Sequence, residues 1–457
     1  MSTPAAAADD GSFEALLAKL DQLRVQAGVA GGVVLISSAS ELKQAAGFGV
    51  TDWESESPMH PDVFVRIGSV TKGLVGLTFL KLQAEGRLTL TDTLAELKAD
   101  TLLDNPWQTT HPITLAQLLE HTAGLTDMVR SEWDHNKPLP LTAALKVAPE
   151  SRRLKWPPGL QNSYSNSGAG VAVAAVEGHL GINFENYFHR EIAAPLGMPT
   201  LTFDDSAATQ ARLIAGYDRD GRSPIPYWHV LYRPFGGLNV KFSELARYLQ
   251  LLLGQGQVAG TQHFSKADIA RAETPTTTAA ARQGLTFGYG LGNYQQNHKG
   301  FVFHGHGGDA DGYLTHCAYN RDAGLGFCLL INAFQNRTLR QMKRAVMDYV
   351  VAGLEPKLKP GQPQPLAHLR SLTGDYEKTS WRFPGARSSE RVQVTLQGSR
   401  LYLQRSGETQ HLVPQGRWQF RRRFEPVATI AFIPQEGGLL LQGPFGNFRR
   451  AAEPTAP

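Results

Sequence analysis

Apolar residues recur every three or four positions in several stretches of this 457-residue chain, the spacing of helices that bury one face. Helices are predicted for residues 12–27, 72–88, 113–125 and 337–354, and helical patterns dominate from about 140 to 255. Glycine is a common residue at the end of a helix. We therefore expect Gly86 to close the second helix and the third to end near Gly124.

Other stretches are rich in β-branched and aromatic residues and are bounded by turn residues, which is typical of strands. Such strands are predicted for residues 31–38, 41–50, 287–295, 300–308, 312–320 and 324–333. The order is therefore helix, strands, a helical middle, strands and helix. This order predicts an α/β protein of the α+β type: an antiparallel sheet flanked by helices, with an inserted helical subdomain. We expect the first and last helices to lie together on one face.

A proline-rich segment, residues 354–366, is typical of an extended linker. It separates a first domain, residues 10–353, from a C-terminal all-β domain, residues 367–457. In the second domain, strands alternate with turns and no helix is expected. Its predicted strands are residues 391–398, 400–407, 410–414, 418–424, 428–435 and 438–443. Short hairpins of this kind predict a small β-sandwich or β-barrel.

The composition is that of an ordinary globular protein, with 42% hydrophobic and 19% charged residues. A net charge of +4 is no reason to expect nucleic acid as a partner. The chain has no run of 18 or more apolar residues, so we expect no membrane span. The first residues lack a basic region followed by an apolar one, so they are not an intact signal peptide. A cytoplasmic protein, or a periplasmic or secreted one whose signal was removed, would both fit.

The chain contains two cysteines, Cys317 and Cys328. They lie in a predicted hairpin whose turn falls around Arg321 to Gly324, and in that register they face each other. They would form a cross-strand disulfide in an oxidising compartment, or pack as two small core residues. Asp309 and Asp311 lack the ligand spacing of a calcium site, so we expect no metal, and no cofactor motif is present.

A serine and a lysine lie one helical turn apart at Ser69 and Lys72, with a glycine before them and an apolar helix after them. At a helix N-terminus the serine N–H is among the unpaired donors, and the lysine at i+3 is within reach of the hydroxyl. A serine nucleophile needs a base, and a buried lysine with a lowered pKa can serve. A second Ser-x-x-Lys, Ser40 to Lys43, falls in a predicted turn and is interpreted as surface structure.

Tyr164-Ser-Asn166 is the only Tyr-x-Asn in the chain and precedes a predicted helix. A tyrosine near a lysine can pass a proton to a leaving group, and an asparagine can hold the lysine and a substrate carbonyl. A helix-capping asparagine beside a packed tyrosine is the alternative. His306-Gly307-Gly308 lies on a predicted strand, where small residues let a substrate backbone approach.

His304 lies two residues before His306, on the same predicted strand face, and is a rival for its role. His121 lies near the end of the third predicted helix and is interpreted as structural.

These three motifs, in this order and on helix, loop and strand, resemble those of the serine β-lactamase-like superfamily. The similarity extends over about residues 12 to 350 and is greatest to class C β-lactamases and their relatives. These relatives include D-amino-acid peptidases, DD-carboxypeptidases, esterases and penicillin-binding-protein-type thioesterases. The resemblance implies a β-lactamase/transpeptidase-like fold. The C-terminal domain resembles the lipocalin-like domain of some members.

The resemblance also implies a role for each residue. Ser69 would attack the substrate and form an acyl-enzyme, while Lys72 and Tyr164 would share the acid and base work. Asn166 would orient the lysine and the substrate. The oxyanion hole would consist of the backbone N–H groups of Ser69 and Asp309.

The third motif departs from the family, which usually has lysine where this chain has His306. A neutral histidine binds a carboxylate less well than lysine does, which favours esters, amides or D-peptides over β-lactams. His306, Gly307 and Gly308 would line the substrate site. We therefore expect a serine hydrolase acting on a small-molecule or peptide substrate, most simply a peptidase or esterase.

Three other enzyme functions are alternatives: a β-lactamase, a DD-carboxypeptidase and a thioesterase that cyclises peptides. A catalytically silent binding or scaffold protein is the non-enzyme alternative. The C-terminal domain is a candidate surface for oligomer formation.

Overall fold

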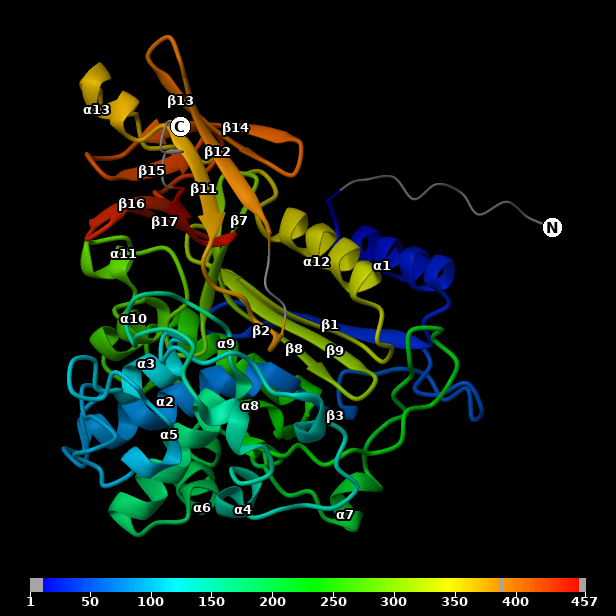
Figure 1. Cartoon of the computed structure of the whole chain (residues 1–457). Coiled ribbons are helices and arrows are strands. Elements are labelled where there is room, and N and C mark those ends of the chain that lie inside the picture. The colour runs from blue at the N-terminus through cyan, green and yellow to red at the C-terminus, as the bar shows by residue number, and fades with distance from the viewer. Residues whose placement is uncertain (1–10, 386–388, 452–457) are drawn as a thin grey trace.

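The computed structural model describes residues 11–385 and 389–451 and is built around a six-stranded antiparallel sheet with the strand order β2-β1-β10-β9-β8-β7 (Figure 1). These strands are β1 (Gly31–Ser37), β2 (Leu42–Gly49), β7 (Tyr294–His298), β8 (Phe301–Ala310), β9 (Tyr313–Asn320) and β10 (Leu325–Ile331). Both chain regions predicted to supply the sheet do so, and β10, from the later region, pairs with β1. The predicted antiparallel sheet is confirmed.

Two helices from opposite ends of the first domain cover one face of this sheet. They are α1 (Phe13–Ala27) and α12 (Asn336–Val350), which contact each other as expected (Figure 1). Ser12 caps the first helix by accepting a hydrogen bond from Ala15 N at 3.1 Å, and Gly28 ends it in the left-handed conformation. The apolar faces of both helices join one hydrophobic core with the sheet.

The opposite face of the sheet packs on α2 (Thr71–Ala84) and α9 (Leu245–Leu253). The predicted second helix is confirmed, and Gly86 follows it with φ of 67°. Most α2 side chains are buried because the helical region surrounds it. The other α-helices of the domain are α3 (Leu115–Leu119), α4 (Leu141–Ala144), α5 (Asn166–Leu180), α6 (Phe184–Phe188), α7 (Ala207–Gln210), α8 (Arg233–Gly236), α10 (Lys266–Glu273) and α11 (Ala279–Arg282).

Short strand pairs complete this domain: β3 (Phe64–Arg66) with β4 (Asn239–Lys241), and β5 (Gln257–Val258) with β6 (Thr261–Gln262).

Two predicted boundaries were wrong. The third helix ends at Leu119 rather than near Gly124, because His121 adopts a left-handed conformation with φ of 59°. The strand predicted for residues 287–295 begins only at Tyr294. The preceding residues pack against α2 instead: a Cβ on Gly292 would lie 2.2 Å from the carbonyl carbon of Lys72.

The hairpin of β9 and β10 has the predicted register, with Cys317 opposite Cys328. The two cysteines are joined by a disulfide. No helix in the described part of the chain is both long and apolar enough to cross a bilayer.

The C-terminal region forms a closed eight-stranded barrel in which each strand pairs with the next along the chain. Its strands are β11 (Gly374–Lys378), β12 (Arg391–Gln397), β13 (Arg400–Arg405), β14 (Glu408–Pro414), β15 (Gln419–Arg422), β16 (Ile430–Gln435), β17 (Gly438–Gly443) and β18 (Gly446–Arg450). The first and last strands were not predicted. The expectation that this region lacks helices was wrong, since α13 (Leu366–Ser371) precedes the barrel and places Leu369 in its core. The residues from 354 to 365, all described, form neither helix nor strand.

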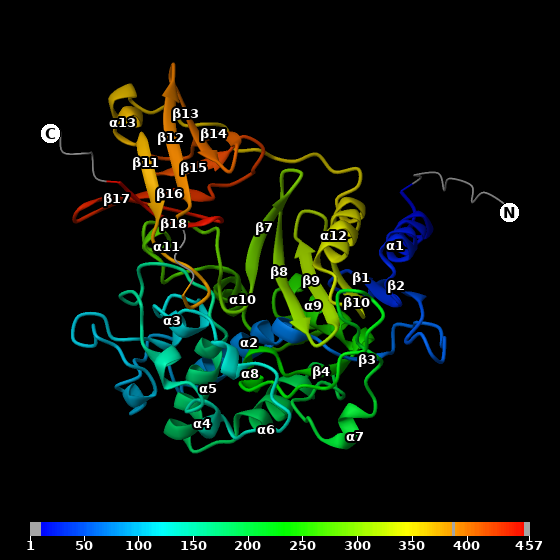
Figure 2. The same cartoon turned by 45° about the vertical axis from the view of Figure 1, so that its right-hand side comes forward.

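The barrel packs on α11, where alanines of the helix share a small apolar core with β16 and β17. Polar contacts extend this interface: Gln442 Nε2 donates to Leu160 O, and Asn447 Nδ2 to Asn162 O, both at 2.8 Å. Figure 2 shows the barrel above the helical region, beside β7. The segment that follows β11 leaves the barrel and extends toward the helices (Figure 1).

Candidate active site

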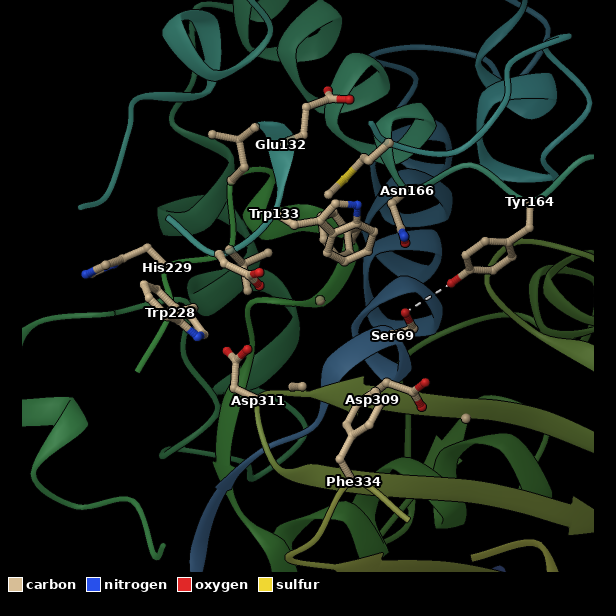
Figure 3. A pocket seen from close by; sticks show the side chains of 18 of the residues that line it. Ser69, Glu132, Trp133, Tyr164, Asn166, Trp228, His229, Asp309, Asp311 and Phe334 are labelled. Carbon is tan, nitrogen blue, oxygen red and sulfur yellow. Dashed lines mark hydrogen bonds between the residues drawn. The ribbon is translucent and has the colours of Figure 1, made fainter. Parts of the chain in front are cut away.

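Ser69 lies in a single 3-10 turn, Gly68–Val70, directly before α2. Its Oγ accepts two hydrogen bonds, from Lys72 Nζ at 2.9 Å and from Tyr164 OH at 3.0 Å. Figure 3 shows the second of these bonds, between two residues that line a pocket. The structure thus brings together the serine, the lysine and the tyrosine that were singled out in the sequence.

Lys72 is buried, with 4% of its surface exposed. Besides Ser69 Oγ, its Nζ donates to Asn166 Oδ1 and to the backbone oxygen of Phe235, each at 2.8 Å. Burial places the pKa of this amine well below its usual value, and the nearby Arg382 lowers it further, while Asp127 and Asp309 oppose the shift. A lysine in this state is suited to act as a base near neutral pH.

Tyr164 lies just before α5, with Lys72 Nζ 4.9 Å from its ring centroid. Burial raises the pKa of its phenol above the usual value of 10.0. The phenol therefore stays protonated and can donate a proton or hydrogen bond. Near neutral pH the lysine can therefore accept a proton, whereas the tyrosine holds its proton and can only donate it.

Asn166 is the first residue of α5, and its side chain does not cap the helix. Its backbone N donates to Asp127 Oδ1 at 2.9 Å, and its Nδ2 donates to Asp127 Oδ2 at 3.3 Å. The amide thereby presents its oxygen to Lys72. The interpretation of Asn166 as a lysine-holding residue fits this geometry better than the capping alternative.

The backbone of residues 67–69 lies directly against the end of β8. A Cβ on Gly308 would lie 1.9 Å from Ile67 O and 3.1 Å from Ser69 N, and one on Gly68 would lie 2.6 Å from Asp309 N. Gly68 also has φ of 50°, which disfavours other residues. These glycines let the backbone N–H groups of Ser69 and Asp309 approach the same region.

His306 lies in β8 beside the pocket and is held as a neutral imidazole. Burial, together with the charge of Lys72, lowers its pKa to about 3. Its Nδ1 donates to Gly307 O, and its Nε2 accepts from Tyr289 OH at 2.8 Å. His304 instead stacks on Tyr319, with ring centroids 5.6 Å apart, and does not line the pocket.

His121 is buried behind Tyr164, with ring centroids 4.2 Å apart. Its Nδ1 accepts a hydrogen bond from Ser165 N at 3.2 Å. This position supports the structural interpretation, since the ring packs against Tyr164. The second Ser-x-x-Lys is a surface feature as predicted: Ser40 is exposed in a turn, and Lys43 pairs with Glu41.

The pocket has a volume of about 420 Å³, and Ser69 lies on its lining. In Figure 3, Trp228 and His229 lie on the far side of Ser69 from Tyr164. Much of the lining is apolar or aromatic, contributed by Met128, Trp133, Trp228, Val230, Leu231, Phe235, Tyr294 and Phe334. A pocket of this kind suits an apolar group next to the reacting bond. The described residues contain no cluster of three or more side chains suited to hold a metal ion.

Two further residues of the site were missed in the sequence. Asp127 is fully buried beneath Asn166, and Arg382 reaches it from the segment after β11, with Nε 2.8 Å from Asp127 Oδ2. The Arg382 guanidinium lies 4.5 Å from the ring centroid of Tyr164 and lines the pocket. A lone acid among uncharged residues, in the stretch Leu125 to Met128, was the only local signal for Asp127. No local pattern marks Arg382.

Comparison with known proteins gives a family match. The family model described as Beta-lactamase matches residues 13–351. Protein flp of Staphylococcus aureus (strain COL) is 22% identical over 311 residues, which cover 66% of this chain and 60% of that protein. The uncharacterized protein MT1414 of Mycobacterium tuberculosis (strain CDC 1551 / Oshkosh) is 27% identical over 282 residues, 55% of this chain and 69% of that protein. The chain thus spans about 60% of the length of the first relative.

Solved structures resemble nearly the whole chain, barrel included. The octameric penicillin-binding protein homologue from Pyrococcus abyssi has a TM-score of 0.62 and 21% identity, covering 96% of this chain and 99% of that one. The structure of SurE with D-Leu has a TM-score of 0.59, 22% identity and the same coverage. At these identities the likeness establishes the fold alone.

Proposed function

Because this chain belongs to the β-lactamase family, we propose that it is a serine hydrolase that cleaves esters or amides through an acyl-enzyme on Ser69. One observation carries the proposal: Lys72 Nζ and Tyr164 OH converge on Ser69 Oγ at 2.9 and 3.0 Å. A nucleophile within hydrogen-bond reach of a base that is itself held in place is typical of covalent catalysis. Here Asn166 and Phe235 O hold the base.

In the proposed reaction Lys72 is neutral, so its two N–H groups donate to Asn166 Oδ1 and Phe235 O and its lone pair faces the Ser69 hydroxyl. It accepts the hydroxyl proton as Oγ attacks the substrate carbonyl. The negative oxygen that forms would be bound by the N–H groups of Ser69 and Asp309, a contribution typically of about 3–4 kcal/mol per donor. Tyr164 would donate its proton to the leaving atom and regain one from the Lys72 ammonium. Water would then attack the acyl-enzyme with the same groups working in reverse.

The state of His306 bears on the substrate class. Since the imidazole is neutral and already bonded at both nitrogens, it offers no cation to a substrate carboxylate. This supports the preference for esters, amides or D-peptides over β-lactams. His306, Gly307 and Gly308, which are consecutive residues of β8, would line the substrate site.

A peptidase acting at a carboxyl terminus, or a peptide-transferring relative of it, is the second candidate. The favouring observation is Arg382, because its two terminal nitrogens find no acceptor within residues 11–385 and 389–451 and the side chain lines the pocket. Guanidinium groups bind carboxylates well. SurE, a neighbour of the same fold, was solved with D-Leu, an amino acid that carries such a group.

The test is covalent labelling with a fluorophosphonate, followed by intact mass and peptide mapping. We expect one adduct, on Ser69, which is lost in Ser69→Ala and kept in the matched variant Ser40→Ala. Wild-type protein that stays unlabelled, or is labelled only elsewhere, would point to the silent binding or scaffold alternative. A panel of p-nitrophenyl esters, D-amino-acid anilides and nitrocefin then separates esterase, peptidase and β-lactamase activity.

We also propose that the protein forms oligomers, with the barrel as a contributing surface. The support is that one neighbour of the same fold is an octamer. Light scattering coupled to size-exclusion chromatography tests this, and a monomer at micromolar concentration would count against it.

A further inference from the structure

The segment after β11 is seated on the helical region beside Ser69. Ser163 Oγ donates to Trp381 O at 3.0 Å, and Asp127 N donates to Arg382 O at 2.6 Å. The Trp381 ring packs edge-on against buried Trp156, with centroids 5.0 Å apart. Backbone and side-chain contacts therefore fix the position of Arg382, although it belongs to the barrel end of the chain.

Asp127, the partner of Arg382, has no exposed surface. Its carboxylate accepts hydrogen bonds from Arg382 Nε at 2.8 Å and from the backbone N of Met128 and of Asn166, both at 2.9 Å. A buried carboxylate is costly unless a cation and several donors compensate it. Arg382 is the cation that pairs with it.

The same carboxylate is linked to the base. Asn166 Nδ2 donates to Asp127 Oδ2 at 3.3 Å, and Asn166 Oδ1 accepts from Lys72 Nζ at 2.8 Å. An amide that donates to a carboxylate on one side must present its oxygen on the other. A continuous path of contacts thus runs from Arg382 through Asp127 and Asn166 to Lys72.

We propose that Arg382 is a positioning residue of the active site: it neutralises Asp127 and, through Asp127 and Asn166, holds Lys72 in its catalytic state. The C-terminal barrel would then supply part of the catalytic apparatus. This inference rests on the proposed function, because it assigns Lys72 as the base.

The charged groups around Lys72 determine how its pKa should change when Arg382 or Asp127 is replaced. The charged groups that face the amine are Asp127 after α3, Asp309 in β8 and Arg382 after β11. Tyr164, His121 and His306 also lie near the amine, and all three are uncharged near neutral pH.

Asp127 raises the Lys72 pKa and Arg382 lowers it. If Arg382 is removed, Asp127 and Asp309 remain and favour the charged lysine. If Asp127 is removed, Arg382 is opposed only by Asp309, and the charged lysine is less favoured than in the wild type.

The experiment is the pH profile of kcat/KM for the full chain with a p-nitrophenyl ester that carries no charge, so that carboxylate binding plays no part. In Arg382→Met, we expect the acidic limb to move to higher pH by about 1 unit. Arg382→Lys should keep most of the wild-type profile because it keeps the charge. Asp127→Asn should move the limb to lower pH, and the double variant should return it toward the wild-type position.

Arg417→Met is the matched control, since Arg417 is exposed on the barrel, over Trp418 and outside the pocket. An Arg382→Met enzyme with lower activity but an unmoved acidic limb would overturn the proposal, as would limbs that move the same way in both single variants. If Arg382→Met does not fold, Arg382→Gln and Asp127→Asn still give opposite predicted shifts.

A second measurement separates this proposal from the proposed function. The pKa of Lys72 can be followed by NMR in ¹³C-lysine-labelled protein, with the signal assigned by Lys72→Met. A higher Lys72 pKa in Arg382→Gln than in wild type supports the coupling even if Ser69 takes no label. An unchanged pKa overturns it even if Ser69 is the nucleophile.

Discussion

Lys72 and Asn166 meet through a 2.8 Å hydrogen bond between Nζ and Oδ1, so the amine beside Ser69 is held by a residue from another helix. The bond fixes the amine where it can exchange a proton with Ser69 Oγ. It also means that the base can be disturbed by changes that touch neither the serine nor the substrate.

Replacing Lys72 should nearly abolish acylation. We expect Lys72→Met to reduce kcat/KM by about 10²–10⁴-fold, the usual contribution of a general base. Lys72→Arg should be similarly impaired, because a guanidinium keeps the positive charge but does not give up a proton near neutral pH. The rate of fluorophosphonate labelling measures the effect without a choice of substrate. Lys43→Met, at the exposed Ser-x-x-Lys, is the control and should label at the wild-type rate.

Activity should fall on the acidic side of the pH profile as Lys72 becomes protonated. Burial lowers the Lys72 pKa well below 10.5, and the base is active only above that lowered value. His306 does not titrate in the working range, because its pKa is about 3. His306→Gln should therefore leave the acidic limb of kcat/KM in place even if the rate drops. Loss of that limb in the variant would assign the titration to the histidine instead.

Tyr164→Phe should discriminate between leaving groups. Since burial keeps the phenol protonated, the tyrosine is expected to protonate the departing atom. Amide and alkyl ester hydrolysis should fall by about 10²-fold or more, whereas a p-nitrophenyl ester, whose leaving group needs no proton, should lose much less. Rates for an anilide and a nitrophenyl ester of the same acyl group test this. Equal losses on both would instead indicate that Tyr164 acts on Ser69.

Gly308→Ala should damage both activity and stability. A Cβ at this position would lie 1.9 Å from Ile67 O, so β8 would have to move away from Ser69. We expect a loss of about 1–3 kcal/mol in unfolding free energy from overpacking, together with reduced kcat/KM as the two backbone N–H groups separate. Thermal unfolding and ester kinetics give the two readings. The matched control is Gly178→Ala in α5, where a Cβ meets nothing within 4 Å. That variant should be neutral or slightly stabilising, because Gly178 is an exposed position within a helix.

The sequence predicted the parts of the site that lie in local motifs. Ser69 and Lys72 share one turn, and Tyr164 and Asn166 flank one helix start, so spacing alone brings each pair together. Their meeting across the fold came from the resemblance to a known family. Arg382 and Asp127 could not be foreseen, because their contact depends on where the barrel is seated, and neither residue stands in a periodic pattern.

The missed strands have a similar physical reason. β11 has the sequence Gly-Asp-Tyr-Glu-Lys, in which only Tyr376 is buried, so a single apolar position carries its inward face. β18 likewise ends in two arginines after Phe448. Both are held by barrel closure, through their pairing with each other and with their neighbours. In strands of only five residues, the alternation of apolar and polar positions is too short to distinguish them from loops in the sequence.

The segment after β11 also limits how the barrel can be exchanged between related proteins, in evolution or by engineering. A crossover in residues 354–365 looks harmless, since that stretch has no secondary structure. A chimera made there would nevertheless combine Asp127 of one parent with the segment after β11 of the other. If that segment had no arginine at the position of Arg382, the buried Asp127 carboxylate would lose its ion-pair partner. The first domain and the barrel should therefore be exchanged together, so that Asp127 and Arg382 come from the same parent.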